Sequence, residues 1–138
     1  DIEVGLRSTI ASALMVLGYR EKAAPNVARA VELAERLYGD NHAVTVRALT
    51  ARGRLRMSAG DYKGAQTDLE RTMAWYARVN HPEIAFQHNL LGEACYRQGD
   101  VASARRHFEV ALQGMRTKFG DRHITTATMI SNLAVMTD

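Results

Sequence analysis

The sequence has few cysteines and prolines, the residues that often rigidify small or secreted folds. It has one cysteine, Cys95, which excludes an internal disulfide, and only two prolines. No apolar run approaches the roughly 18 residues that a membrane-spanning helix requires. Alternation of Val, Ile and Thr with polar residues is rare, whereas alanine occurs 21 times. This composition excludes an all-β fold and favours helices.

Charge of one sign is also scarce. The 18 basic side chains are nearly matched by 15 acidic ones, which gives a net charge of +3. Arg and Glu alternate along most segments and do not form the cationic stripe typical of nucleic-acid-binding proteins. Because the chain has 138 residues, 46% of them apolar, we expect one domain, residues 1–138, with its own hydrophobic core.

An internal repeat is the most informative feature that the sequence does have. Gly18, Gly60 and Gly99 stand in similar short motifs and are separated by 42 and 39 residues. The same two spacings, in reverse order, separate His42, His81 and His123. Two helices fit into each period if short turns join them, so the spacing predicts an α-solenoid of antiparallel helix pairs.

The helices are predicted from apolar spacing and from residues typical of helix ends. Asp61 and Asp100 are expected to cap the helices that follow them, and Gly60 and Gly99 to close the preceding ones. Pro82 is expected at the first position of its helix. The predicted helices cover residues 2–17, 19–38, 42–59, 61–78, 82–98, 100–119 and 123–136.

The third of the repeated units has the most complete motif, which consists in order of Leu91-Gly92, Gly99-Asp100, Ala104, Phe108 and Ala111. Each unit resembles a tetratricopeptide repeat of the roughly 42-residue kind found in kinesin light chains. The resemblance implies an all-α, right-handed α-solenoid. Repeat 1 would cover about 2–41, repeat 2 about 42–80 and repeat 3 about 81–122, with a partial repeat or capping helix over 123–138.

The resemblance also implies that the first helix of each unit lines a concave, peptide-binding groove. Asn132 matches an asparagine with which light-chain repeats hold a peptide backbone, and Asn89 lies one residue from the corresponding place. Helical spacing then selects Ser12, Met15, Arg47, Thr50, Arg54, Phe86, Asn89, Glu93, Tyr96, Arg97, Ser131 and Asn132. The net positive charge and the aromatic rings of this set suit an extended acidic segment with one large apolar side chain.

Arg52 and Arg56 occupy positions that are apolar in the other units, and two unpaired buried guanidinium groups would be strongly destabilising. A carboxylate on a neighbouring helix can pair with them, or their stems can pack while the charged heads reach water. The candidate carboxylates are Glu32, Glu35, Asp68 and Glu70. The remaining alternative is an anion site for a carboxylate or phosphate.

No catalytic motif is present, so we expect no enzymatic activity, no cofactor and no metal. The repeated histidines are expected to start helices because one metal ion cannot reach all of them. Cys95 is expected to be a buried, inert thiol.

The sequence therefore predicts a protein-interaction module that binds a protein or peptide, with neither nucleic acid nor membrane as partner. We expect it to be cytoplasmic and part of a larger multidomain protein. The alternative is a structural spacer or oligomerisation domain, with a homodimer formed through the open C-terminal end. The last helix, residues 124–136, carries Met129, Ile130 and Leu133 for that contact.

Overall fold

The computed structural model describes residues 2–136, and over this range the chain forms seven α-helices and no strand. All seven predicted helices are present, with ends within two residues of the prediction. In order they are α1 (Ile2–Val16), α2 (Arg20–Tyr38), α3 (Ala43–Ala59), α4 (Tyr62–Arg78), α5 (Ile84–Arg97), α6 (Val101–Phe119) and α7 (Ile124–Val135). None of the helices formed by these residues is long and apolar enough to cross a bilayer.

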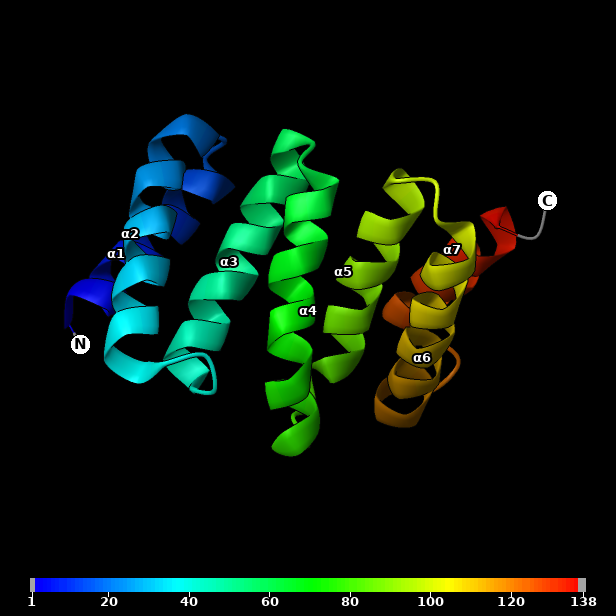
Figure 1. Ribbon diagram of the computed structural model, residues 1–138. Helices are drawn as coiled ribbons and strands as arrows, with labels where there is room; N and C mark the ends of the chain where they lie inside the picture. The colour runs from blue at the N-terminus through cyan, green and yellow to red at the C-terminus, as the bar shows by residue number, and fades with distance from the viewer. Residues whose placement is uncertain (1, 137–138) are drawn as a thin grey trace. The chain divides into compact units, whose positions relative to one another are not determined.

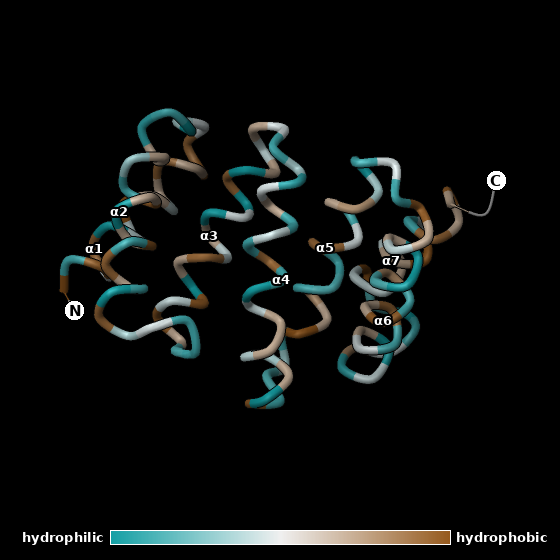
Figure 2. Tube along the Cα trace, in the orientation of Figure 1, coloured by the Kyte–Doolittle hydropathy of each residue, from teal (hydrophilic) through white to brown (hydrophobic). Residues whose placement is uncertain are grey.

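The contacts divide the chain into two compact units, with the border inside α4. Unit 1 extends to Trp75 and unit 2 begins at Tyr76. Hydrophobic and hydrophilic segments are interspersed along the chain (Figure 2), and α2, α4 and α6 are the clearly amphipathic helices, each burying one face. The division into three repeats within one domain stays a prediction.

In unit 1, α1 and α2 form a helix pair and α3 packs beside α2 (Figure 1). Small residues allow the helices to approach closely, since Ala11 and Ala23 are almost completely buried in one core cluster. The contact between α3 and α4 uses Gly53, where an added Cβ would lie 3.1 Å from the side chain of Leu69. Small residues at these points let the helix backbones approach closely.

In unit 2, α6 packs against both α5 and α7. One stripe of α6 is buried in full, since Ala104, Phe108, Ala111 and Met115 are at most 4% exposed. Gly92 of α5 faces Phe108 so closely that an added Cβ would lie 2.8 Å from the ring. Cys95 is buried in the same cluster, as predicted.

His42 and His123 are the N-caps of α3 and α7, which confirms the role predicted for them, whereas His81 lies in the turn before α5, whose N-cap is Glu83. In each case Nδ1 accepts a hydrogen bond from the backbone N–H two residues later. Each imidazole also contacts an aromatic ring near the end of the preceding helix, a feature the sequence analysis did not predict. The ring pairs are Tyr38–His42 at 4.5 Å, Tyr76–His81 at 5.2 Å and Phe119–His123 at 4.4 Å between centroids.

The other helix ends follow the prediction with one exception. Asp61 and Asp100 accept hydrogen bonds from backbone N–H groups three residues later, and Gly60 and Gly99 have left-handed φ angles of 85°. The placement of Pro82 at the first helical position is wrong. Pro82 lies in a turn and α5 begins at Ile84, because the cap from the His81 imidazole goes to Glu83.

Candidate functional site

The predicted peptide-binding residues lie on α1 and α3 in unit 1 and on α5 and α7 in unit 2. On α3, Arg47, Thr50 and Arg54 share one face because they are three and seven residues apart. Arg47 and Arg54 are exposed, and neither has an ion-pair partner among residues 2–136. Between them Thr50 Oγ1 is buried without a hydrogen-bond partner. This face of α3 therefore has two uncompensated positive charges and one unused hydroxyl.

α1 contributes differently from the prediction. Met15 is half-buried and packs against the core, while Ser12 is exposed. A pocket of about 370 Å³ between α1 and α3 includes Arg47 but neither of these two residues. Its other lining residues are Val4, Gly5, Ser8, Thr9 and Val44.

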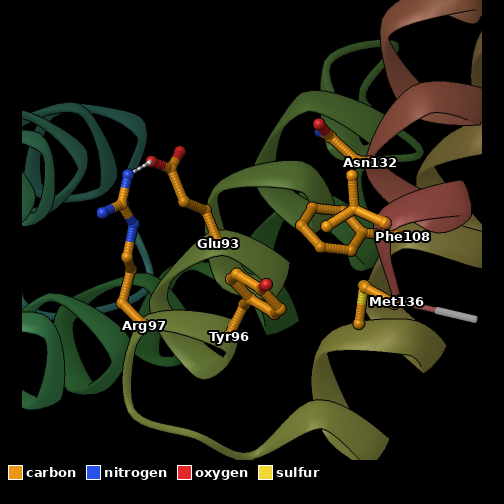
Figure 3. A pocket seen from close by; sticks show the side chains of 7 residues that line it. Glu93, Tyr96, Arg97, Phe108, Asn132 and Met136 are labelled. Atoms are coloured by element: carbon orange, nitrogen blue, oxygen red, sulfur yellow. Dashed lines mark ion pairs between the residues drawn. The ribbon is translucent and has the colours of Figure 1, made fainter. Parts of the chain in front are cut away.

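In unit 2 a pocket of about 270 Å³ gathers predicted residues from two helices. Figure 3 shows Tyr96 of α5 and Asn132 of α7 bordering the same space, with the Phe108 ring and Met136 beside them. The full lining is Glu93, Tyr96, Arg97, Phe108, Asn132, Val135 and Met136. Phe108 and Met136 were missed as site residues, because helical spacing assigns Phe108 to the core and cannot show that its ring also borders a cavity.

The pocket is apolar inside and nearly neutral at its rim. Phe108 and Met136 are 4% and 7% exposed, whereas Tyr96 is 41% exposed and is accessible to a ligand. Arg97 Nη2 lies 3.9 Å from Glu93 Oε1, so the one cation here has a carboxylate beside it (Figure 3). The positive charge expected of the site therefore resides on α3 rather than around this pocket.

Three predicted residues of unit 2 lie outside this pocket. Phe86 packs edge-on against Phe119, with 6.3 Å between the ring centroids. The Ser131 hydroxyl donates to the carbonyl of Ala127 within its own helix. Asn89 Oδ1 is buried and has no hydrogen-bond partner, so Asn89 keeps an unused acceptor.

Arg52 and Arg56 pair with one buried carboxylate. Asp68, 1% exposed, accepts hydrogen bonds from Arg52 Nε and Nη2 at 3.0 and 2.9 Å. It also accepts one from Arg56 Nη1 at 2.8 Å. Of the four carboxylates that the sequence offered, Asp68 is the one that pairs with these arginines, and Arg56 Nε also lies 3.7 Å from Asp61 Oδ2. The presence of Arg52 and Arg56 at positions that are apolar in the other units is thus explained by their pairing with a carboxylate of the chain itself.

A pocket of about 540 Å³ lies beside this cluster in unit 1, between α2 and α3. Arginines and carboxylates are equal in number in and directly beneath it, so it has no surplus positive charge to attract an anion. The arginines are Arg20, Arg52 and Arg56, and the carboxylates are those of Glu21, Asp61 and Asp68. An anion site at Arg52 and Arg56 stays a prediction.

A histidine pair that sequence reasoning missed connects α5 and α6. The Nδ1 atoms of His88 and His107 are 3.1 Å apart and the ring centroids 5.4 Å apart, a distance at which one nitrogen can donate a hydrogen bond to the other. Burial lowers the pKa of His88, and the nearby charge of protonated His107 lowers it further. No group of three His, Cys, Asp or Glu side chains within residues 2–136 is arranged to hold a metal ion.

The inner face of α7 is well enclosed. Met129 is 2% exposed and packs against Ala85 and Met115, and Leu133 packs against Phe108. Of the three residues predicted for a dimer contact, Ile130 is the exposed one, at 41%. A homodimer through this end stays a prediction.

The sequence profile of the tetratricopeptide repeat matches residues 4–78 and 47–117 of this chain. The chain belongs to the tetratricopeptide repeat family. Tetratricopeptide repeats are generally protein–protein interaction modules rather than catalysts. A search of curated proteins finds no match.

Solved tetratricopeptide-repeat structures have the same fold. The match to BtubC (BKLC) from P. vanneervenii has a TM-score of 0.77 at 19% identity. It covers 96% of this chain and 54% of that one. The "nearly identical TPR-like repeats" of a kinesin light chain candidate from Podosopora anserina match with a TM-score of 0.84 at 17% identity, covering 96% of this chain and 64% of that one. The chain thus spans less than two thirds of either structure, and the likeness confirms an all-α fold of antiparallel tetratricopeptide helix pairs.

Proposed function

We propose that this tetratricopeptide-repeat chain is a protein-interaction module that binds an extended, acidic segment of a partner protein. The observation that carries the proposal is the face of α3, where Arg47 and Arg54 have no ion-pair partner among residues 2–136 and Thr50 Oγ1 is buried without a hydrogen bond. Unpaired guanidinium groups attract carboxylates, and a buried unused hydroxyl is stabilised when a ligand supplies its missing partner.

The spacing on α3 indicates which acidic pattern fits. Arg47 and Arg54 are seven residues apart, which is about 10 Å along a helix axis. In a polyproline-type extended peptide, side chains three residues apart point the same way and are about 9 Å apart. Flexible arginine side chains span the remaining difference, so acidic residues at positions i and i+3 match this face.

Unused acceptors support a peptide backbone as the ligand. Asn89 Oδ1 in unit 2 and Thr50 Oγ1 in unit 1 are both buried without partners. Most buried polar atoms in folded proteins form a hydrogen bond, so these two atoms lack partners that a ligand could supply once the side chains turn toward it. An extended peptide offers an N–H at every residue other than proline.

The pocket of unit 2 supports one large apolar side chain in the ligand. Its volume of about 270 Å³ and its interior of Phe108 and Met136 suit an aromatic or leucine side chain. Tyr96 lies at the opening, where its ring can pack on the incoming group.

Fluorescence anisotropy with a labelled peptide tests the proposal. The peptide carries two acidic residues at i and i+3 and one Trp, and a lysine-substituted peptide serves as the reference. We expect the acidic peptide to bind more tightly, with an affinity that falls as salt rises. Replacing Arg47 and Arg54 by Ala should weaken binding at least ten-fold. Equal loss in a variant with Ala at Arg36 and Arg78, two exposed arginines elsewhere, would contradict the assignment.

The pocket has its own test in a double-mutant cycle. The affinity of the Trp peptide is compared with that of the same peptide carrying Ala, in the wild type and in Tyr96→Ala. We expect the advantage of Trp to shrink several-fold in the variant. An undiminished advantage would place the apolar group elsewhere on the chain.

A further inference from the structure

The pocket of about 540 Å³ between α2 and α3 has an apolar interior. Val27 of α2 and Leu55 of α3 form its floor and are 2% and 8% exposed. Ala24, Ala28 and Ala59 line its sides, and their short side chains leave the space open. We refer to this pocket as the α2–α3 pocket. Its volume falls within the range of about 300–1,000 Å³ that is typical of ligand sites.

The α2–α3 pocket lies on the side of α3 that faces away from the proposed acidic-peptide face. Successive residues of an α-helix are rotated by about 100° around its axis. The residues of α3 that line the pocket are therefore centred about 160° around the helix from Arg47, Thr50 and Arg54. A ligand in this pocket uses none of the residues that would bind the acidic segment, so the two sites can be tested separately.

Two arginines of α3 that line this pocket have hydrogen-bond donors to spare. Asp68 accepts from Nε and Nη2 of Arg52 and from Nη1 of Arg56. The Gly64 carbonyl accepts a further bond from Arg56 Nη1 at 3.3 Å. A guanidinium group has five N–H donors, so Arg52 Nη1 and Arg56 Nη2 keep donors that no residue within 2–136 accepts. The ion cluster thus holds both groups in place and leaves part of each available to a ligand.

The charges around the α2–α3 pocket favour a neutral ligand. Asp68 lies beneath the two arginines and is 1% exposed, and Glu21 and Asp61 line the pocket itself. These three carboxylates balance the three arginines of the site, so a charged ligand loses its hydration and gains little net attraction. A neutral oxygen acceptor needs only the free N–H groups. Because the arginines are already held by Asp68, little side-chain freedom is lost when the acceptor binds.

We propose that the α2–α3 pocket binds an uncharged peptide segment of a partner protein. One large apolar side chain of the segment packs against Val27 and Leu55. A backbone carbonyl beside that side chain accepts a hydrogen bond from Arg52 or Arg56. Every peptide residue carries a neutral carbonyl next to its own side chain, so a peptide offers the apolar group and the acceptor within one or two residues.

An NMR titration of the isotope-labelled chain with the capped tripeptide acetyl-Ala-Phe-Ala-amide tests the proposal. We expect the methyl signals of Ala24, Ala28 and Leu55 to shift and to saturate. The same tripeptide with a free carboxyl terminus or a free amino terminus carries one charge, and each should bind several-fold more weakly. Tighter binding of the anionic form would overturn the neutral assignment. Unshifted pocket signals, or shifts confined to Tyr96 and Met136 of the other pocket, would overturn the site.

Filling the pocket provides a matched pair of variants. Ala28 and Ala102 are both exposed alanines on helices, but only Ala28 lines the α2–α3 pocket. Ala28→Phe places a ring in the open space and should weaken binding of the capped tripeptide by about ten-fold or more. Ala102→Phe should leave the affinity unchanged. An equal effect of the two changes, or none from Ala28→Phe, would overturn the site.

The role of the arginines is tested by combining Arg52→Leu, Arg56→Leu and Asp68→Leu. This variant removes both guanidinium groups together with their carboxylate, and circular dichroism checks that it is folded. A ligand held by apolar contacts alone would bind the variant at least as tightly as the wild type. We expect the capped tripeptide to lose affinity several-fold, because its carbonyl loses its donors. Unchanged or tighter binding would overturn the hydrogen bonds, and Ala28→Phe tests the site without altering the ion cluster.

Discussion

Two helix pairs of this chain have the same spacing but are stabilised by different chemistry. Positions 39 residues apart are equivalent in the two pairs. Arg52 and Arg56 of α3 correspond to Leu91 and Cys95 of α5, and Asp68 of α4 corresponds to His107 of α6. The first pair buries an ion cluster with three hydrogen bonds to one carboxylate. The second buries an apolar cluster and connects its helices through a histidine pair.

What the two pairs share is the close contact of small and large residues. Gly53 faces Leu69 in one, and Gly92 faces Phe108 in the other. The contact of a glycine with a bulky side chain therefore sets how closely the helices approach, and the neighbouring positions can be ionic or apolar. The distance between paired helices in this fold thus depends on the size of the residues at the contact more than on the polarity of their neighbours.

The largest effect is expected from Asp68→Ala in the ion cluster. The change leaves two guanidinium groups without their shared carboxylate. Removal of one partner of a fully buried ion pair costs about 3–5 kcal/mol. Because the side chains of Arg52 and Arg56 are 23% and 34% exposed, water compensates in part and we expect about 2–4 kcal/mol. Urea unfolding followed by circular dichroism measures the difference.

A triple variant with Leu at positions 52, 56 and 68 makes this pair resemble α5–α6. It removes Arg52, Arg56 and Asp68 at once and leaves only Asp61, whose side chain is 56% exposed, without its arginine, so we expect a free energy of unfolding within about 1–2 kcal/mol of the wild type. A triple variant as unstable as Asp68→Ala would show that the ion cluster is required for packing and is not simply a set of charges that must balance.

The second prediction concerns the two glycine contacts. Gly92→Ala should destabilise by about 1–3 kcal/mol because the new methyl group would lie 2.8 Å from the Phe108 ring, which cannot move easily in a buried core. Gly53→Ala should cost less, since its nearest atom belongs to the more flexible Leu69 side chain, 3.1 Å away. Thermal unfolding distinguishes them. Recovery of stability in a Gly92→Ala, Phe108→Leu double variant confirms the cause.

The third prediction is a pH dependence of stability that arises in α5–α6 at His88. Because the pKa of His88 is lowered in the folded state, mainly by burial, the folded state favours neutral His88. The stability that this preference provides is present above the ordinary histidine pKa of about 6.5 and is lost as the pH falls below it. Urea midpoints at pH 7.5 and 5.5 measure the loss. His88→Leu, which places at this position the residue found at Leu49 of α3, should reduce the change in urea midpoint between the two pH values. An equally large change in the variant would contradict the role of His88.

The smallest effect is expected at the helix starts. His42→Ala in unit 1 and His123→Ala in unit 2 each remove one capping acceptor and one ring contact, so each should destabilise by about 1 kcal/mol. Asn at either position keeps a capping acceptor and should recover part of the loss. Equal stability of the Ala and Asn variants would show that the ring contact, not the cap, matters.

The fold could be predicted closely because its signals are local. Glycines with left-handed φ angles and capping aspartates fix the helix ends to within two residues, and small residues mark the crossings. The start of α5 was misplaced because two local signals compete there, the helix preference of Pro82 and the cap from His81.

The candidate site was only partly predictable, because periodicity assigns a face to each helix but does not say which faces meet. The alignment of Arg47, Thr50 and Arg54 on one face follows from the period of a single helix, α3. The pocket of Phe108, Asn132 and Met136 combines two helices, and the pairing of His88 with His107 depends on how α5 and α6 align. The sequence offered four carboxylates, Asp68 among them, as partners for Arg52 and Arg56, because the spacing of residues along one helix does not give distances to side chains on another helix.

The imidazole–aromatic contact at each turn has a consequence for how the chain folds. The two rings are four or five residues apart in sequence, so little chain entropy is lost when they meet. Each turn can therefore form before distant segments come together, and low contact order generally accompanies rapid folding. Three such early-forming turns provide separate places from which neighbouring helices can grow.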